Sequence, residues 1–315
     1  MKADAPQAAA EAQKTAPAVP VRPDEPANKA AAPASVAPPK AAATVAATPA
    51  AASPVASPVD AAPISGPARV GGIALESIEA LADLPTDVHR MLVRAATIET
   101  LQASETRVDF GAALVIAGQV SVRAKSPPNL GVIADAPAFV PSRGSLPDGY
   151  AWCLVAGPAG ATIARWTSAF FEETLGSCSW VLDDCHAMAD RLQARVGLAL
   201  GALAELDATT RDRIAEQLEM RVVSPAEVVA EENAPMPGLV FVVAGALELM
   251  EGEVPAVVGE VRPGEPLFPD ALWAGAPTPL TSRAAASGAL LLVADRRAAL
   301  ALAESVPLVG EILSR

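Results

Sequence analysis

The sequence is poor in aromatic and histidine side chains. The first shortage limits how the core can be built, and the second limits the catalysis that the protein could perform. Aromatic residues make up only 3% of the 315 residues. The core must therefore be built mainly from Val, Leu and Ile, which suit β structure as readily as helices. His89 and His186 are the only histidines, so there is little room for histidine-based acid–base or nucleophilic catalysis. We expect no enzyme and no catalytic residues.

Cysteine is scarce as well, and its spacing argues against a disulfide framework or a metal site. Cys153, Cys178 and Cys185 are an odd number without framework spacing. Cys185 is followed directly by His186, and neighbouring residues on a helix point about 100° apart. The two side chains are therefore unsuited to binding one zinc ion or to acting as nucleophile and base. We expect buried or half-exposed thiols, no metal and no cofactor.

Long apolar runs and surplus positive charge are also absent. No segment reaches the roughly 18 uninterrupted apolar residues of a membrane helix, and no apolar signal region follows Met1 and Lys2. The formal net charge is -13, which repels the phosphate backbone of nucleic acids. We expect a cytoplasmic protein that binds neither membranes nor nucleic acid.

Residues 1–68 contain no leucine and no aromatic side chain, and they consist largely of Ala and Pro. Such a segment cannot bury enough large apolar surface to offset the entropy of ordering it. We therefore predict a disordered tail over residues 1–68. Its acidic and basic residues are equal in number, so the net charge falls on the remainder of the chain.

Residues 69–315 contain two similar segments, each about as long as a domain. The sequence Leu-Ala-Asp-Leu at 81–84 recurs as Leu-Ala-Glu-Leu at 203–206, and the apolar run at 114–120 recurs at 241–247. The copies lie far beyond the roughly 20 to 45 residues of a solenoid unit. We predict two related domains in tandem, over residues 69–200 and 201–315.

The second copy predicts a helix, then short strands, then closing helices. Asp207 is a suitable N-cap for a helix over 208–220. Short β-branched runs separated by Gly, Pro and Asn predict strands. These runs are 221–223, 227–230, 238–243, 246–250, 256–261 and 289–294. Residues 296–305 and 308–313 predict helices. The pattern is that of a mainly β fold with flanking helices, either a sandwich or a double-sheet jelly roll.

Five segments of this copy follow one another in a familiar order: 214–218, 222–229, 239–245, the Val-Arg-Pro-Gly turn at 261–264, and 291–296. In this order they resemble the cyclic nucleotide-binding domain of the catabolite-activator and protein kinase A regulatory type. The first copy resembles the same family more faintly, at 101–105, 114–122 and 161–171. The resemblance implies two β-rolls in tandem, each of eight strands flanked by helices.

The resemblance also implies a ligand site, from which this chain departs. In the family, a cassette after the Pro-Gly turn combines backbone N–H groups and an arginine for the cyclic phosphate with a glutamate for the ribose. Phe268 stands where glycine is expected, Pro269 where glutamate is expected, and Thr278 where arginine is expected. Proline offers neither an N–H nor a carboxylate, and phenylalanine fills the space that glycine leaves open. The degenerate cassette positions are Gly264, Phe268, Pro269, Asp270, Ala271 and Thr278, with Arg283 as the candidate substitute for the arginine.

The first copy has no recognisable cassette between residues 127 and 150, only Pro- and Gly-rich sequence around Arg143. We therefore expect a non-enzymatic regulatory or scaffolding protein that has lost standard cyclic nucleotide binding. The alternative is a sensor that binds a cyclic nucleotide or another small molecule in an altered pocket. Phe268 and Trp273 separate the two: side chains that fill the roll close the pocket, whereas an open cavity lined by Arg283 favours sensing.

An apolar row at helical spacing lies between the two copies. It comprises Cys185, Met188, Leu192, Val196, Leu200, Leu203 and Leu206. Such a row predicts a helix with one buried side. In the resembling family the helix after the roll commonly forms a dimer interface. The row therefore predicts either a homodimer through Cys185 to Leu200 or packing onto the second roll. The identity of a protein partner is left open.

Overall fold

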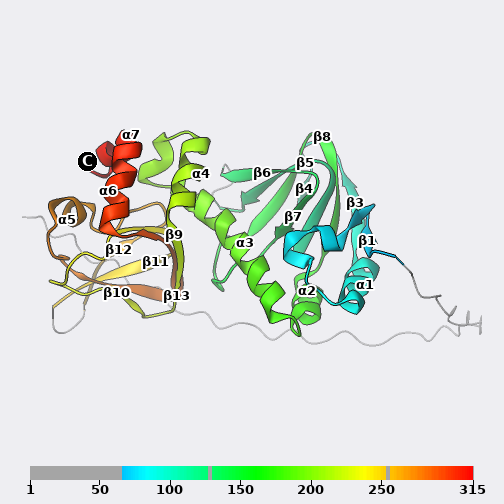
Figure 1. The fold of residues 1–315 in the computed structure, drawn as a ribbon, viewed down its shortest axis with the longest axis horizontal. Helices are drawn as coiled ribbons and strands as arrows, with labels where there is room; N and C mark the ends of the chain where they lie inside the picture. The colour runs from blue at the N-terminus through cyan, green and yellow to red at the C-terminus, as the bar shows by residue number, and fades with distance from the viewer. Residues whose placement is uncertain (1–65, 127–129, 253–255, 315) are drawn as a thin grey trace, which may run out of the picture. The chain divides into compact units, whose positions relative to one another are not determined.

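The structure is a computed structural model that describes residues 66–126, 130–252 and 256–314 (Figure 1). The predicted tail lies outside the described residues except for its last three positions. Ala68 is buried, and its N–H donates to Glu76 at 3.1 Å. The described chain is mainly β with flanking helices, which confirms the predicted fold class.

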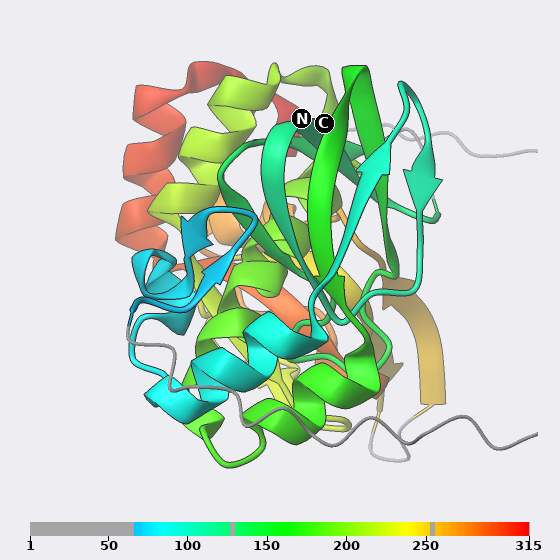
Figure 2. The same cartoon turned by 90° about the vertical axis from the view of Figure 1, so that its right-hand side faces the viewer.

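The first sheet is antiparallel and is centred on two long strands. Its strands are β3 (Thr97–Leu101), β4 (Thr106–Arg107), β5 (Ala112–Ala124), β6 (Gly131–Asp135), β7 (Ala138–Pro141) and β8 (Trp152–Trp166). They follow the order β3-β8-β5-β6, with β4 paired to β8 and β7 paired to β5. A short ribbon of β1 (Arg69–Val70) and β2 (Ile73–Ala74) precedes this sheet. Figure 2 shows its long strands above α1, which is drawn in cyan.

The second sheet repeats this plan with five strands in place of six. Its strands are β9 (Glu219–Val223), β10 (Val228–Ala230), β11 (Leu239–Glu251), β12 (Ala256–Val261) and β13 (Thr281–Ala294), in the order β10-β13-β11-β12 with β9 paired to β13. The central pair β11 and β13 corresponds to β5 and β8. Residues 264–267 hydrogen-bond to β11, as β7 does to β5.

The repeated Ala-Gly motif occupies the same place in both central pairs. Gly118 lies opposite Ala161, Gly245 lies opposite Ala289, and the register shifts on both sides of each motif. Both glycines have positive φ, +79° and +71°, and a Cβ on either would meet the backbone of the opposing strand. Bulges of this kind bend the strand. The turn expected at residues 244–245 is therefore wrong, because a bend inside one strand has the same Gly signature as a turn between two.

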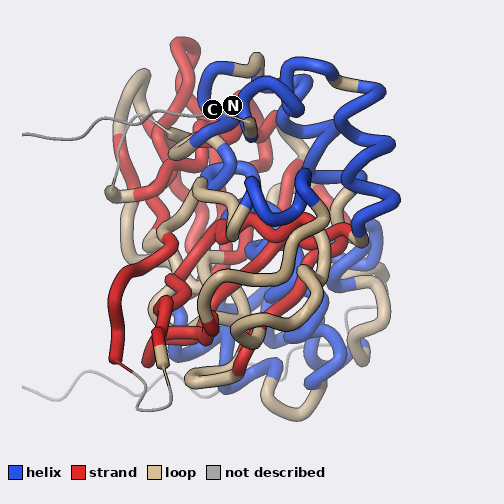
Figure 3. The backbone as a smooth tube through the Cα atoms, turned by 90° about the vertical axis from the view of Figure 1, so that its left-hand side faces the viewer, coloured by secondary structure: helices blue, strands red, loops and turns tan. Residues whose placement is uncertain are grey.

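The helices, drawn in blue in Figure 3, flank the strands. They are α1 (Thr86–Ala95), α2 (Ser168–Leu175), α3 (Ser179–Leu198), α4 (Ala208–Gln217), α5 (Pro269–Ala274), α6 (Arg296–Ser305) and α7 (Pro307–Leu313), with short 3-10 turns at Leu75–Ser77, Glu79–Leu81 and Ala202–Glu205. The closing helices are confirmed. Within the three described stretches, no helix is long and apolar enough to cross a membrane.

The helix predicted over 208–220 starts as expected and ends early. Asp207 caps α4 by accepting from the backbone N–H of Thr210 at 2.9 Å and from its hydroxyl at 2.7 Å. These bonds lower the pKa of the Asp207 carboxyl. The helix stops at Gln217 because Glu219 already pairs with Val293 of β13. Strand pairing therefore ends the helix earlier than its apolar spacing predicts.

Each sheet buries two clusters of apolar side chains, one on each face. On β11, Phe241 and Val243 pack against the helices, whereas Val240 and Val242 face the interior of the roll. On β5, alternate residues divide in the same way. We call the helix-side groups the outer clusters and the groups within each roll the inner clusters.

Candidate functional site

The turn that opens the degenerate cassette is held tightly against the second sheet. Gly264 has φ +91° and donates its N–H to the carbonyl of Val242 at 2.7 Å. A Cβ at this position would collide with the backbone of Gly201. Leu267 then donates its N–H to Val240 at 2.8 Å. The segment from 264 to 267 thus continues the sheet, and its inward N–H groups are used by β11.

Phe268 follows with a backbone conformation that few residues adopt. Its φ of +44° and ψ of +54° are left-handed, and it precedes the first turn of α5, which begins at Pro269. The half-buried side chain packs against the inner cluster of the second sheet. Phe268 therefore lies on the inner-cluster side of the second sheet, where part of its side chain stays exposed. Asp270 and Ala271 both belong to α5, where Asp270 is exposed and Ala271 is buried.

Thr278 is fully engaged by a neighbouring loop. It is buried, with 1% of its surface exposed, and its hydroxyl donates to the carbonyl oxygens of Glu231 and, at 3.2 Å, Ala234. Its own N–H donates to Ala234 at 2.9 Å, and its carbonyl accepts from Asn233 at 2.8 Å. The residue at the arginine position thus fastens the loop at 231–234.

Arg283 lies on the face of β13 that points away from the inner cluster. Its neighbour Ala284 belongs to that cluster, and side chains alternate along a strand. The guanidinium contacts one oxygen of Glu248 from Nε at 2.9 Å and from a terminal nitrogen at 2.8 Å. Its charge is therefore already paired, on the outside of the roll.

Trp273 behaves differently from Phe268. It is half-buried against the outer cluster of the second sheet, so it does not fill the roll. Its indole Nε1 is buried and has no hydrogen-bond partner among the described residues. The two aromatic side chains expected to decide the state of the pocket thus lie on opposite faces, and Phe268 is the one on the inner-cluster side.

In the first roll, the loop at 142–150 replaces a cassette and is fastened to α3. Asp190, with 1% of its surface exposed, accepts from the N–H and hydroxyl of Ser145 at 3.0 and 2.6 Å and from Gln193 at 3.0 Å. Gln193 in turn accepts from the N–H of Tyr150 at 3.2 Å. A Cβ on Gly144 would collide with the Asp190 carboxylate. Sequence reasoning missed this cluster, although Asp190 and Gln193 stand out as polar residues beside the apolar row.

The interior of the first roll is filled by an aromatic residue and by α3. Trp152 is 3% exposed, and its ring lies 5.9 Å from that of Tyr150. Leu192 and Val196 of α3 pack against the same inner cluster. Burial raises the pKa of Tyr150 to about 12, and its hydroxyl donates to the carbonyl of Val243 at 3.1 Å.

The helix predicted over the apolar row ends at Leu198, so Leu200, Leu203 and Leu206 lie beyond α3. The row is nevertheless used within the chain. Cys185 and Met188 pack in the outer cluster of the first sheet, and Leu203 and Leu206 pack in the outer cluster of the second. Packing onto the second roll is therefore observed for the end of the row. The homodimer through Cys185, Met188, Leu192, Val196 and Leu200 stays a prediction. Cys185 and Val196 have only 1% and 2% of their surface exposed for it.

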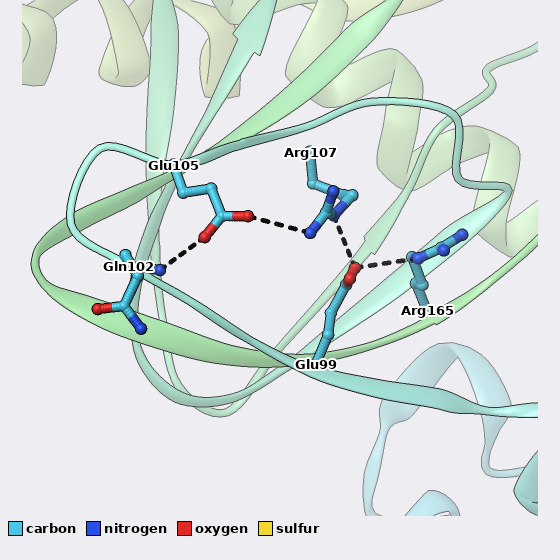
Figure 4. Close-up of polar contacts among 5 residues, drawn as sticks. All are labelled: Glu99, Gln102, Glu105, Arg107 and Arg165. Atoms are coloured by element: carbon cyan, nitrogen blue, oxygen red, sulfur yellow. Dashed lines mark hydrogen bonds and ion pairs between the residues drawn. The ribbon is translucent and has the colours of Figure 1, made fainter.

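A charged network that the sequence did not reveal joins three strands of the first sheet (Figure 4). One oxygen of Glu99 accepts from Nε of Arg107 at 2.9 Å and from Nε of Arg165 at 3.0 Å. Arg107 also donates to Glu105 at 3.2 Å. Two guanidinium groups are balanced by two carboxylates, so the network holds β3, β4 and β8 together without leaving a surplus charge.

The cysteine and histidine side chains lie in apolar or structural settings. Cys178 and Cys185 are buried and Cys153 is half-buried. Burial, with a smaller contribution from Asp184, raises the pKa of the Cys185 thiol to about 12. His89 is buried, and its Nε2 donates to the carbonyl of Leu81 at 2.7 Å. The part of the chain that the structure describes holds no group of His, Cys, Asp or Glu placed to bind a metal ion.

A scan against protein-family models and a search of the curated proteins gave no match. Among solved structures, the chain is similar to the regulatory domain of protein kinase A from Toxoplasma gondii with cAMP, at 14% identity over 75% of this chain and 89% of that one, with a TM-score of 0.34. It is also similar to the regulatory subunit of a cAMP-independent protein kinase A from Trypanosoma cruzi bound to guanosine, at 14% identity over 76% and 83%, with a TM-score of 0.33.

A third similar structure is the catabolite activator protein of Thermus thermophilus, at 19% identity over 38% of this chain and 55% of that one, with a TM-score of 0.33. These proteins are regulators of the types that the sequence motifs resemble. Identities and TM-scores this low carry no argument about what the present chain binds, so its function is argued from its own residues.

Proposed function

We propose that this chain is a non-enzymatic regulatory or scaffolding protein, built from two degenerate cyclic nucleotide-binding-like domains over residues 69–200 and 201–315. In this proposal neither domain binds a cyclic nucleotide in the standard way. The observation that carries it is Phe268, whose side chain packs in the inner cluster at the head of α5. In this proposal, the Phe268 side chain stands in the way of a cyclic nucleotide at this cassette.

The groups at this cassette that could bind a cyclic phosphate make other contacts instead. A buried anion needs converging N–H donors and a charged partner. At this cassette the N–H of Leu267 donates to Val240, and Pro269 has no N–H to offer. Thr278 donates to backbone carbonyls. Arg283 is paired with Glu248 on the opposite face. A phosphate placed here would lack a guanidinium partner.

The first domain supports the same conclusion by another route. Trp152 and the α3 residues Leu192 and Val196 occupy its inner cluster. The loop that would carry a cassette is instead fastened to Asp190 and Gln193. In the proposed protein, surfaces rather than roll interiors contact partners, as a fold can be retained while its function moves to another site.

A thermal-shift screen of the full chain with cyclic AMP, cyclic GMP and cyclic dinucleotides tests this proposal. A ligand that binds only the folded state adds about 2.7 kcal/mol of stability at a hundredfold excess over its dissociation constant. We expect no change in melting temperature for the wild type. We also expect none for Phe268→Ala, because opening the interior does not restore an anion partner. A saturable rise in the wild type would instead support the sensor.

A further inference from the structure

A hollow of about 480 Å³ lies between α3 and α4, outside both rolls. Its apolar floor includes Leu218, Met220 and Leu292, which come from the end of α4 and from strands β9 and β13. Leu218 and Leu292 are buried and Met220 is half-buried. The floor is therefore part of the fixed helix-side packing of the second sheet, and the space above it is open to solvent.

The two walls of the hollow carry opposite charges. Arg191 and Arg195 line it from α3, and Asp212 and Glu216 line it from α4. Arg195 and Asp212 approach to 3.4 Å and join the two walls. Arg191 lies one helical turn before Arg195, Glu216 lies one turn after Asp212, and both line the same hollow. Both are exposed, and neither has a hydrogen-bond or ion-pair partner within residues 66–126, 130–252 and 256–314.

We infer that this hollow binds a peptide segment of a protein partner. An apolar side chain of the segment rests on the floor, an acidic side chain pairs with Arg191, and a basic side chain pairs with Glu216. The inference rests on the proposed scaffolding function, since it names the kind of partner that such a protein would hold. An apolar pocket rimmed by separated charges is typical of surfaces that bind partners with a fixed orientation.

The charges of the walls decide against other occupants. A nucleic acid or a simple anion would meet Glu216 and Asp212 on one wall. A purely apolar ligand would leave Arg191 and Glu216 unused. A segment with one charge of each sign on either side of an apolar anchor satisfies both walls and the floor together. Opposite charges on facing walls also fix the direction in which the segment lies.

The test is to select binding peptides from a random heptapeptide library displayed on phage, with the full chain as bait. Selected sequences are then synthesised with a fluorescent label, and their dissociation constants are measured by fluorescence polarisation. We expect an apolar residue flanked by an acidic residue on one side and a basic residue on the other, in one fixed order. Failure to enrich any such sequence overturns the inference.

Charge reversal makes the test specific to the hollow. Arg191→Glu and Glu216→Arg should each weaken binding about fivefold, because each variant loses one exposed ion pair and places a like charge opposite the peptide. The combined reversal should bind peptides in which the acidic and basic residues are exchanged. Arg213→Ala, on α4 but outside the hollow, is the matched control and should leave affinity unchanged.

Equal binding of the selected peptides to the wild type and to Arg191→Glu would overturn the site. Exchanging the charges of the peptide against the wild-type chain gives the same information without any protein variant. This outcome is separate from that of the nucleotide screen. Loss of the peptide site leaves the proposed absence of nucleotide binding intact, and saturable nucleotide binding would overturn that function whatever the peptides do.

Discussion

Phe268 combines two features that seldom occur together, a left-handed backbone and a large apolar side chain that packs against the inner cluster of the second sheet. A residue with a Cβ in this conformation costs about 1 to 2 kcal/mol relative to the right-handed region. That cost is sustained only because the side chain gains burial against the inner cluster. Substitutions at this position can therefore distinguish the free-energy cost of the left-handed backbone from the gain of side-chain packing.

Phe268→Ala should destabilise the protein by about 2 kcal/mol, because it removes half-buried packing and keeps the strained backbone. Phe268→Gly should cost less, about 1 kcal/mol, because glycine adopts positive φ without penalty. The free energies of unfolding are measured by urea denaturation. An alanine variant as stable as the glycine variant would show that the left-handed conformation at this position contributes nothing.

Tyr150 makes the stability of the protein depend on pH in the alkaline range. Burial raises its pKa from 10.0 to about 12, so the folded state keeps the phenol neutral where the unfolded state ionises. The folded state then binds more protons than the unfolded state, and stability falls as pH rises from about 10 to about 12. Below pH 10 this contribution is constant.

Tyr150→Phe should make the alkaline limb of a plot of unfolding free energy against pH less steep, and the slope that remains includes the contribution of the Cys185 thiol. The variant also loses the hydrogen bond to Val243, so its stability at pH 7 should be lower by about 1 kcal/mol. Denaturant titrations at a series of pH values give the whole curve. An identical slope for the variant and the wild type above pH 10 would contradict the assignment.

At the scale of elements, the helix α3 determines what the first roll can hold. Its polar residues Asp190 and Gln193 fix the loop at 142–150, and its apolar residues Leu192 and Val196 cover the inner cluster. Positions 190 and 193 of α3 therefore contact the loop, whereas positions 192 and 196 contact the inner cluster. The loop and the helix are thus expected to detach together.

Asp190→Ala should destabilise the protein by about 2 kcal/mol, because the buried amide of Gln193 and the N–H of Ser145 lose their acceptor. Hydrogen exchange of the amides at 142–150 should accelerate more than that of the second sheet. Asp183→Ala, at an exposed position on the same helix, is the control and should change stability by less than about 0.5 kcal/mol. Equal effects of the two substitutions would contradict this account of the loop.

The elements also show what a sequence can and cannot predict. The strand at 256–261 and the helix at 296–305 follow their periodicity and are confirmed with the same bounds. The continuous β11 was missed because Gly245 gives the same pattern for a bulge as for a turn. Asp190 and the network around Glu99 were missed because their partners lie 45 and 66 residues away in the chain. Pairings at such distances leave no local pattern.

Across the whole molecule, an equivalent pair of glycines bends the central strands of each sheet. Gly118 and Gly160 bend the central pair of the first sheet, and Gly245 and Gly288 bend that of the second. Added Cβ atoms on Gly160 and Gly288 would meet the last residue of the equivalent strands, Leu101 of β3 and Val223 of β9. This correspondence supports the proposed kinship of the two domains. Different residues nevertheless pack in their inner clusters, Phe268 in one and α3 with Trp152 in the other.

Calorimetric titration of the full chain with cyclic AMP, followed by cyclic GMP, tests the central claim most directly. Heats of binding report on both rolls at once and require no assumption about which site is used. The account predicts only heats of dilution up to millimolar nucleotide, because apolar side chains form the inner cluster of each roll and Arg283, the candidate phosphate partner, is paired with Glu248 on the other face of its strand. A saturable heat with a stoichiometry of one or two nucleotides per chain would contradict it.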